Sequence, residues 1–142
     1  MKCSEVMTDN PVCCLPNDSV GQAARVMRRE HIGPLPVVND EQTREIVGIV
    51  TDRDLAIKVV AESRDPNRTT VADVMTHTIV VCHEDDDLSS AIAAMEEYQI
   101  RRIPVIDQGG RIVGIISQAD VATRLHEPEK TAEMIEEISR AA

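Results

Sequence analysis

The sequence predicts an α/β (α+β) fold in which two β-α-β-β-α repeats pack with pseudo-twofold symmetry into one module. Three sequence blocks occur twice, at an offset of 68 residues for the first two blocks and 66 for the third. A turn between the blocks can absorb the difference of two residues. A duplicated supersecondary unit also predicts two related clefts. The paired blocks are Val6-Met7-Thr8 with Val74-Met75-Thr76, Ile32–Val38 with Ile100–Ile106, and Ile46–Asp54 with Ile112–Asp120.

Composition and charge exclude several classes of function. The chain is 42% hydrophobic and 28% charged, and no apolar run approaches the roughly 20 residues that span a bilayer. Its start lacks the apolar stretch of a signal peptide, so we expect a cytoplasmic location. The net charge of −10 argues against nucleic acid and anionic membranes as partners, although placed arginines could still bind a small anion. Tyr98 is the only aromatic residue, which excludes a series of base-stacking platforms.

Helix-capping patterns place two helices in the first repeat. Ser19 with Gln22 forms a capping box, which predicts a helix beginning near Val20 and ending at Gly33-Pro34. Thr51 can cap a second helix, whose early aspartates suit the positive end of the helix dipole. The expected buried stripe of this second helix is Leu55, Ala56, Val59 and Val60. The expected strands are Pro11–Leu15, Leu35–Val38 and Ile46–Val50.

The second repeat follows the same order. Asp87 is the expected N-cap of a helix that runs to about Gln99, and another helix begins near Gln118. After Pro128, an amphipathic helix over 129–140 is expected to place Met134, Ile135 and Ile138 on one side. The expected strands are 79–82, 103–106 and 112–116.

These patterns divide the chain into four segments. The first repeat covers 1–62 and a linker containing Asp65-Pro66-Asn67 covers 63–72. The second repeat covers 73–126, and a C-terminal helical tail covers 127–142. Packing onto the body is the simplest role for that tail.

The most informative motif is Gly-apolar-apolar-Thr/Ser-x-x-Asp at each strand-to-helix turn. A hydroxyl and free helix N–H groups at a strand end suit a phosphate or sugar oxygen. An aspartate one turn later can accept hydrogen bonds from both hydroxyls of a ribose. The alternative is that these residues only cap their helices, but two copies, each after a similar Pro-Val strand, favour a nucleoside site. The motif occurs as Gly48–Asp54 and as Gly114–Asp120.

Taken together, these blocks resemble a pair of cystathionine-beta-synthase (CBS) domains, the tandem often called a Bateman module. The resemblance covers about Glu5 to Leu125 and rests on the Val-Met-Thr openings, both Pro-Val strands and both turns. The chain is similar to short stand-alone bacterial two-CBS proteins, including the hypoxic-response type. The resemblance implies a non-enzymatic regulatory module whose clefts bind AMP, ADP, ATP, NAD or S-adenosylmethionine and which signals energy or redox state to an unknown partner. No cofactor is implied, and a homodimer is expected.

The resemblance also implies two ligand sites in clefts between the repeats, each using residues of both. In one, Thr51 and Asp54 would hold ribose and phosphate, with Gly33 and Pro34 beside the base and Ile79 and Val80 as an apolar wall. The other would use Ser117 and Asp120, with Thr8, Pro11 and Val12 from the opposite first strand. Arg101 and Arg102 would meet phosphate in this second site.

The two sites differ at the phosphate-facing positions. Gly33 and Pro34 stand where the second repeat has Arg101 and Arg102, so one cleft should lose charged phosphate contacts. Because such bonds are each worth about 1.5–3 kcal/mol, we expect affinities that differ by roughly tenfold or more. The alternatives are that both arginines pair with Glu96 or Glu97, or that the protein is a stress-response or interaction protein with empty clefts.

Other candidate chemistry is weaker. The turn from Cys82 to Asp87 contains metal-type ligands, but acidic residues commonly cap helices, so we expect no metal site. Cys14 and Cys82 are equivalent under the 68-residue offset; buried strand thiols are expected, with a redox-sensitive pair as the alternative. No nucleophile-base set is evident, so we expect no catalysis.

Charge on the first helix of each repeat suggests a dimer arrangement. Arg25, Arg28 and Arg29 lie on the first, and Glu96 and Glu97 on its counterpart. Opposite charges would favour the first repeat of one protomer facing the second repeat of its partner, although surface pairs contribute little.

Overall fold

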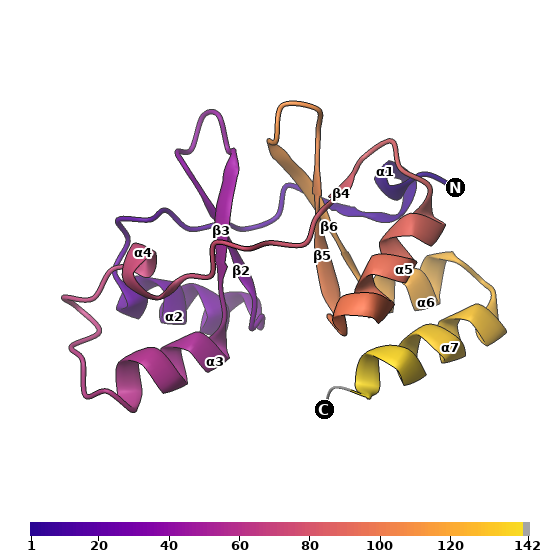
Figure 1. Ribbon diagram of the computed structural model, residues 1–142. Coiled ribbons are helices and arrows are strands. Elements are labelled where there is room, and N and C mark those ends of the chain that lie inside the picture. Colours follow the sequence, from indigo (N-terminus) through magenta and orange to yellow (C-terminus); the bar gives the residue numbers. More distant parts are fainter. Residues whose placement is uncertain (141–142) are drawn as a thin grey trace. The chain divides into compact units, whose positions relative to one another are not determined.

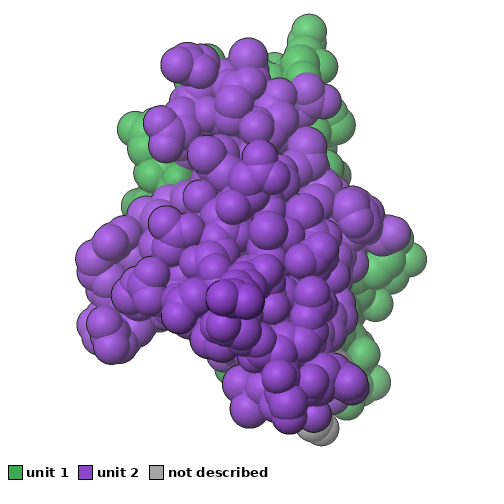
Figure 2. Space-filling view, turned by 90° about the vertical axis from the view of Figure 1, so that its left-hand side faces the viewer, with its two compact units in different colours: residues 1–11, 80–142 green, residues 12–79 purple. Residues whose placement is uncertain are grey.

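Two compact units make up the computed structural model, which describes residues 1–140 (Figure 1). Unit 1 combines Met1–Pro11 with the chain from Val80 onward, and unit 2 is Val12–Ile79; Figure 2 colours them green and purple. The boundaries of these two units differ from those of the sequence repeats. Residues 1–11 of the first repeat pack in unit 1 with most of the second repeat, and residues 73–79 of the second repeat pack in unit 2 with most of the first. The last two residues of the predicted tail, 141–142, lie outside the described residues.

Unit 2 packs helices against a two-stranded antiparallel sheet of β2 (Leu35–Val38) and β3 (Ile46–Val50). All four residues of β2 are buried, as their unbroken apolar run predicts. Its helical elements are α2 (Val20–Glu30), α3 (Asp52–Leu55), the π-helix η1 (Ala56–Val60) and α4 (Val71–Val74).

Unit 1 has a four-stranded sheet in the order β1-β6-β5-β4. Its strands are β1 (Thr8–Asp9), β4 (Cys82–His83), β5 (Arg102–Ile106) and β6 (Ile112–Ser117). Its helices are α1 (Cys3–Val6), α5 (Leu88–Tyr98), α6 (Gln118–Arg124) and α7 (Pro128–Ser139). Helix α7 packs on α5 and α6 with Met134 and Ile138 buried, while Ile135 is 43% exposed and does not join that side as predicted. Among residues 1–140, no helix is both long and apolar enough to cross a membrane.

Three predicted elements differ in the structure. The strand predicted over 11–15 is reduced to one parallel bridge between Cys14 and Val37, since Pro11 and Pro16 on either side have no N–H to extend a ladder. The strand predicted over 79–82 is instead the two-residue β4. Helix α2 ends at Glu30, before the predicted Gly33-Pro34 stop, because His31 adopts a left-handed φ of 54°.

The predicted buried stripe of the second helix is only partly right. Val59 is buried and Leu55 packs against the core, whereas Ala56 is exposed and Val60 is 74% exposed. The helix changes from α to π geometry at Ala56, and the Ala61 N–H bonds to the Ala56 carbonyl. The wider hydrogen bonding of a π-helix changes the angle between successive side chains. A residue assigned to the buried side with the α-helical period, such as Val60, can therefore lie on the exposed side.

Candidate functional site

Each strand-to-helix turn is closed by a reciprocal capping box. In unit 2, the Asp54 N–H donates to the Thr51 hydroxyl at 3.1 Å, and the Thr51 N–H donates to Asp54 Oδ2 at 3.0 Å. In unit 1, the Asp120 N–H donates to the Ser117 hydroxyl at 3.1 Å, and the Ser117 N–H donates to Asp120 Oδ2 at 3.0 Å. Capping, which the sequence offered as the alternative function of these residues, is therefore built into both turns.

The second carboxylate oxygen distinguishes the two turns. Lys58 Nζ lies 3.1 Å from Asp54 Oδ1, and the Asp54 side chain is only 15% exposed. Among residues 1–140, Asp120 forms no such ion pair, and its residue is half-buried. Asp120 thus keeps one carboxylate oxygen for an external donor, whereas Asp54 has both oxygens engaged.

Lys58 and its counterpart Arg124 each also donate a hydrogen bond to a backbone carbonyl. Lys58 Nζ donates to the Val74 carbonyl at 2.9 Å, and Arg124 at the equivalent position donates to the Val6 carbonyl at 2.9 Å. Each cation therefore satisfies a carbonyl at the C-terminal end of a short helix, α4 or α1. Only the lysine reaches its aspartate as well.

The motif glycines make room for methionine. A Cβ on Gly48 would lie 2.8 Å from Met75 Sδ and 2.9 Å from the Thr76 carbonyl oxygen. A Cβ on Gly114 would overlap the Met7 side chain. The Val-Met-Thr blocks thus supply the neighbours that approach these glycines most closely, and this packing explains why the two motifs repeat together.

The threonine of each Val-Met-Thr block lies along the strand that leads to a turn. Thr8 in β1 pairs with Ile115 of β6. Thr76 forms an equivalent bridge with Ile49, with backbone hydrogen bonds of 3.0 and 2.8 Å. Sequence reasoning selected Thr8 but missed Thr76, although the 68-residue offset identifies it directly.

The residues before β2 and β5 adjoin the turns. The Asp52 N–H donates to the Gly33 carbonyl at 3.1 Å, and the Gln118 N–H donates to the Arg101 carbonyl at 3.0 Å. Arg102 pairs with Ser117 across β5 and β6. The structure therefore brings the arginines of unit 1 to the end of β6 where α6 begins.

Neither arginine is paired with an acidic side chain. Within residues 1–140, no carboxylate forms an ion pair with Arg101 or Arg102, so the predicted alternative of pairing with Glu96 or Glu97 is not found. Glu96 instead faces α7, where burial and the nearby charges of Glu137 and Glu133 raise the pKa of its carboxyl.

A buried acceptor adjoins the unit 1 turn. The side-chain oxygen of Gln118 is buried and has no hydrogen-bond partner among the described residues. Because a buried polar atom without a partner is destabilising, this oxygen is suited to accept a bond from a ligand donor.

The remaining predicted residues are divided between the units. Thr8 and Pro11 belong to unit 1 with Ser117 and Asp120, and Ile79 belongs to unit 2 with Thr51, Asp54, Gly33 and Pro34. Val12 lies in unit 2 and Val80 in unit 1. Their grouping with turns of the other unit stays a prediction.

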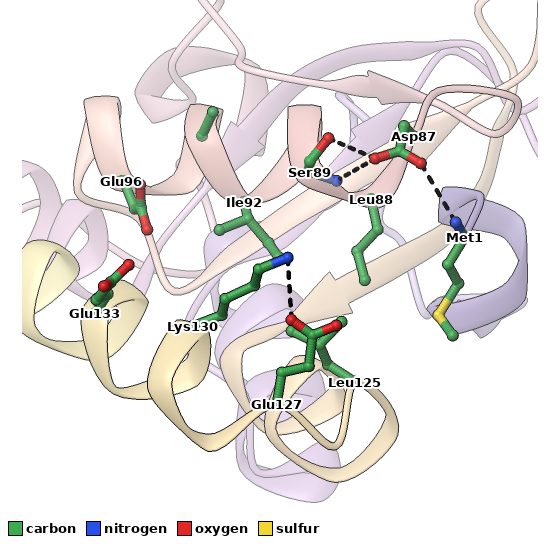
Figure 3. A pocket seen from close by; sticks show the side chains of 11 residues that line it. Met1, Asp87, Leu88, Ser89, Ile92, Glu96, Leu125, Glu127, Lys130 and Glu133 are labelled. Carbon is green, nitrogen blue, oxygen red and sulfur yellow. Dashed lines mark hydrogen bonds and ion pairs between the residues drawn. The ribbon is translucent and has the colours of Figure 1, made fainter.

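A pocket of about 390 Å³ lies elsewhere in unit 1, between α5, α7 and the N-terminus (Figure 3). It contains the pairs Lys130–Glu127 at 3.0 Å and Met1 ammonium–Asp87 at 3.3 Å. None of the predicted site residues lines this pocket, and no motif in the sequence indicated it.

The acidic turn after β4 consists of helix and turn caps. Asp87 accepts from the Ser89 N–H at 3.0 Å, and bonds from Ser89 and the N-terminus lower the pKa of its carboxyl to about 2. Asp86 accepts from the His83 N–H at 2.9 Å. In the part of the chain that the structure describes, no three His, Cys, Asp or Glu residues form a group that could hold a metal ion.

Comparison with known proteins identifies the family. The CBS domain model matches residues 3–61 and 71–127, so the chain belongs to the CBS domain family. It is 34% identical over 123 residues to hypoxic response protein 1 of Mycobacterium tuberculosis, covering 87% of this chain and 84% of that protein. It is 32% identical to uncharacterized protein MK0525 of Methanopyrus kandleri, but spans only 59% of that protein's length.

Solved structures of CBS proteins share the fold. The structure of hypoxic response protein I with two coordinated zinc ions superposes with a TM-score of 0.79 at 32% identity, covering 87% of this chain and 98% of that one. The structure of CBSX2 in complex with AMP superposes with a TM-score of 0.76 at 26% identity, covering 90% of this chain and 98% of that one. The CBS pair of MJ0100 with 5-methylthioadenosine and S-adenosylmethionine gives 0.73 at 29% identity, covering 91% and 98%. These matches confirm the predicted α+β Bateman module.

Proposed function

We propose that this protein is a non-enzymatic regulatory module that binds an adenosyl ligand, with the Ser117–Asp120 turn as its higher-affinity site. Two similar solved structures support the ligand class, one holding AMP and the other 5-methylthioadenosine and S-adenosylmethionine. The observation that carries the assignment to unit 1 is the free oxygen of Asp120, in a turn whose neighbouring strand begins with two arginines that form no ion pair within residues 1–140.

Each polar group of this site has a distinct role in the proposal. The free Asp120 oxygen accepts from the ribose hydroxyls, while the Ser117 hydroxyl donates to a sugar or phosphate oxygen. Arg101 and Arg102 neutralise phosphate. The unpartnered Gln118 oxygen accepts from an amino group, which adenine offers. Thr8 and Pro11 of the same unit complete the wall.

The equivalent site of unit 2 is weaker in this proposal. Lys58 occupies the oxygen of Asp54 that a ribose would need, at 3.1 Å. Gly33 and Pro34 offer no charge to a phosphate. Losing one charge-assisted hydrogen bond lowers affinity by about 1.5–3 kcal/mol, which is roughly tenfold or more.

A thermal-shift panel with AMP, ADP, ATP, NAD and S-adenosylmethionine tests the function. A ligand at 100 times its dissociation constant should stabilise the protein by about 2.7 kcal/mol, which raises its Tm. Asp120→Asn should remove the larger part of that shift, because an amide is a poorer acceptor for the ribose hydroxyls, and Asp54→Asn should reduce it little. Absence of a shift with every ligand would contradict the proposal.

The alternative is an interaction or stress-response protein with empty clefts. The capping boxes favour it, because Thr51 and Ser117 already accept backbone bonds without any ligand. A module with empty clefts would show no ligand shift and the same ligand insensitivity in the Asp120→Asn variant.

We further propose that the ligand signal passes to a protein partner through a homodimer, without catalysis. The predicted charge match of Arg25, Arg28 and Arg29 with Glu96 and Glu97 of the partner stays a prediction. Sedimentation of the wild type and of a variant with Arg28→Glu and Arg29→Glu measures it, and an unchanged dimer would contradict the predicted arrangement.

A further inference from the structure

Two cysteines far apart in sequence lie side by side in unit 1. Cys3 is in α1 and Cys82 in β4, and both belong to the same buried core cluster of unit 1. The Cys3 thiol donates to the Asp87 carbonyl at 3.9 Å, and the Cys82 thiol donates to the Pro104 carbonyl at 3.8 Å. Backbone bonds hold α1 against the turn after β4: the Cys3 N–H donates to the Asp86 carbonyl at 2.9 Å and the Ser4 N–H to the Glu84 carbonyl at 3.0 Å. Cys3 is 0% exposed and Cys82 is 4% exposed.

Unit 2 repeats this backbone arrangement with a single thiol. The Val71 N–H donates to the Asp18 carbonyl at 2.8 Å, and the Ala72 N–H donates to the Pro16 carbonyl at 2.9 Å. Under the 68-residue offset, Val71 replaces Cys3 and Cys14 replaces Cys82. The packing therefore tolerates valine at this position, so the second thiol of unit 1 is not needed for the fold.

The environments of the thiols also differ. Interaction with the Cys82 side chain lowers the pKa of the Cys3 thiol, while interaction with Cys3 and burial raise the pKa of Cys82. In unit 2, burial raises the pKa of Cys14 to about 12. Since the thiolate is the nucleophile, Cys3 is the more reactive member of its pair.

We propose that Cys3 and Cys82 are a modification site that forms a reversible intramolecular disulfide on exposure to hydrogen peroxide. The Cys3 thiolate attacks the peroxide; its S–O bond forms as the O–O bond breaks, and the leaving hydroxide takes a proton to become water. Cys82 then attacks the oxidised sulfur of Cys3. The S–S bond forms, the S–O bond breaks, and the departing hydroxide takes the Cys82 proton to leave as a second water.

Local opening of the N-terminal segment gives the oxidant access. Surface pairs hold the first residues of this segment, Met1 ammonium with Asp87 at 3.3 Å and Lys2 with Asp85 at 3.6 Å. Their side chains are 45–66% exposed, and such pairs contribute little to stability. Chain ends commonly open without global unfolding, and the disulfide would tie this end to β4.

Peptide mapping of the peroxide-treated native protein tests the proposal. After free thiols are blocked, cleavage behind glutamate places Cys3 in peptide 1–5, Cys82 in peptide 63–84, and Cys13 with Cys14 in peptide 6–30. We expect peptides 1–5 and 63–84 to be joined, with a loss of two hydrogens that dithiothreitol reverses. Recovery of both peptides as blocked thiols, or a bond from either to peptide 6–30, would overturn the proposal.

Matched variants separate the disulfide from effects on folding. Cys3→Val reproduces the arrangement of unit 2, so it should fold with a Tm near that of the reduced wild type and give no joined peptide. Cys13→Ser should leave the joined peptide unchanged. The Tm of the wild type should rise by about 5–10 °C on oxidation, since the bond closes a long loop, and that of Cys3→Val should not. An equal rise in Cys3→Val would contradict the assignment.

Discussion

The two units place the same turn in different chemical surroundings. Both turns have capping boxes with the same distances, a methionine against the glycine and a basic side chain bonded to a short-helix carbonyl. In unit 2 the basic side chain also binds Asp54, while in unit 1 Asp120 keeps a free oxygen. The backbones of Arg101 and Arg102 adjoin the unit 1 turn. The groups that hold the backbone are the same in both repeats, and the groups that we propose to face a ligand differ.

Core substitutions at equivalent positions should separate the stabilities of the units most strongly. Met95 of unit 1 is 0% exposed, and Met27 at the matching position of unit 2 is 7% exposed. Met95→Ala should lower the free energy of unfolding by about 2–5 kcal/mol, with Met27→Ala near the lower end of that range. Urea denaturation measures both, and a larger loss in Met27→Ala would contradict the comparison.

Removing the unpaired arginines should weaken ligand binding without changing the fold. Changing Arg101 and Arg102 to alanine should lower the affinity for AMP by roughly tenfold or more, because phosphate loses charge-assisted bonds. The urea midpoint should stay near that of the wild type, since neither side chain forms an ion pair within residues 1–140. Unchanged affinity would show that the arginines do not meet ligand.

Truncating the caps should destabilise both units by similar amounts. Ser117→Ala and Thr51→Ala each remove the hydroxyl oxygen that accepts a hydrogen bond from an aspartate N–H at 3.1 Å. Each should lower the free energy of unfolding by about 1 kcal/mol. Thermal unfolding without ligand measures the loss, and a much larger effect in one unit would show that the turns are not equivalent in the empty state.

Acid should weaken the first long helix of unit 1 and leave its counterpart unaffected. Asp87 caps α5 with a pKa lowered to about 2, whereas Ser19, which does not titrate, caps α2. Because the pKa of Asp87 is lower in the folded protein than the value of about 4 in the unfolded chain, its ionised carboxylate stabilises the folded state at pH values above about 4. This stabilisation is lost as the pH falls from about 4 to about 2. Asp87→Ser should make the free energy of unfolding depend less steeply on pH between about 4 and about 2, as measured by urea denaturation at several pH values. An unchanged slope would show that the Asp87 carboxylate does not cause the loss of stability in acid.

The duplicated blocks predicted the architecture because they contain the strongest local signals. Capping residues such as Ser19 and Asp87 and the apolar runs of β2, β3 and β6 correctly placed the longer helices and most strands. The four-residue helices α1 and α4 were missed, since they are too short for periodicity to reveal. The π-helix at Ala56–Val60 was missed because its hydrogen bonding departs from the assumed period.

The candidate site was predictable in its residues but only partly in its chemistry. Ser117, Asp120 and the arginines follow from the repeated motif and its mismatch. The contact of Lys58 with Asp54 depends on how η1 continues from α3, so it could not be assigned from spacing. The Cys3–Cys82 pair depends on the N-terminal segment joining unit 1, which the repeat boundaries did not indicate.

Calorimetric titration with AMP tests the inequality of the two sites most directly. The account predicts one tighter site for each chain, a second at least about tenfold weaker, and selective loss of the tighter site in Asp120→Asn. Two equal sites in the wild type, or loss of the tighter site in Asp54→Asn with Asp120→Asn unaffected, would contradict it.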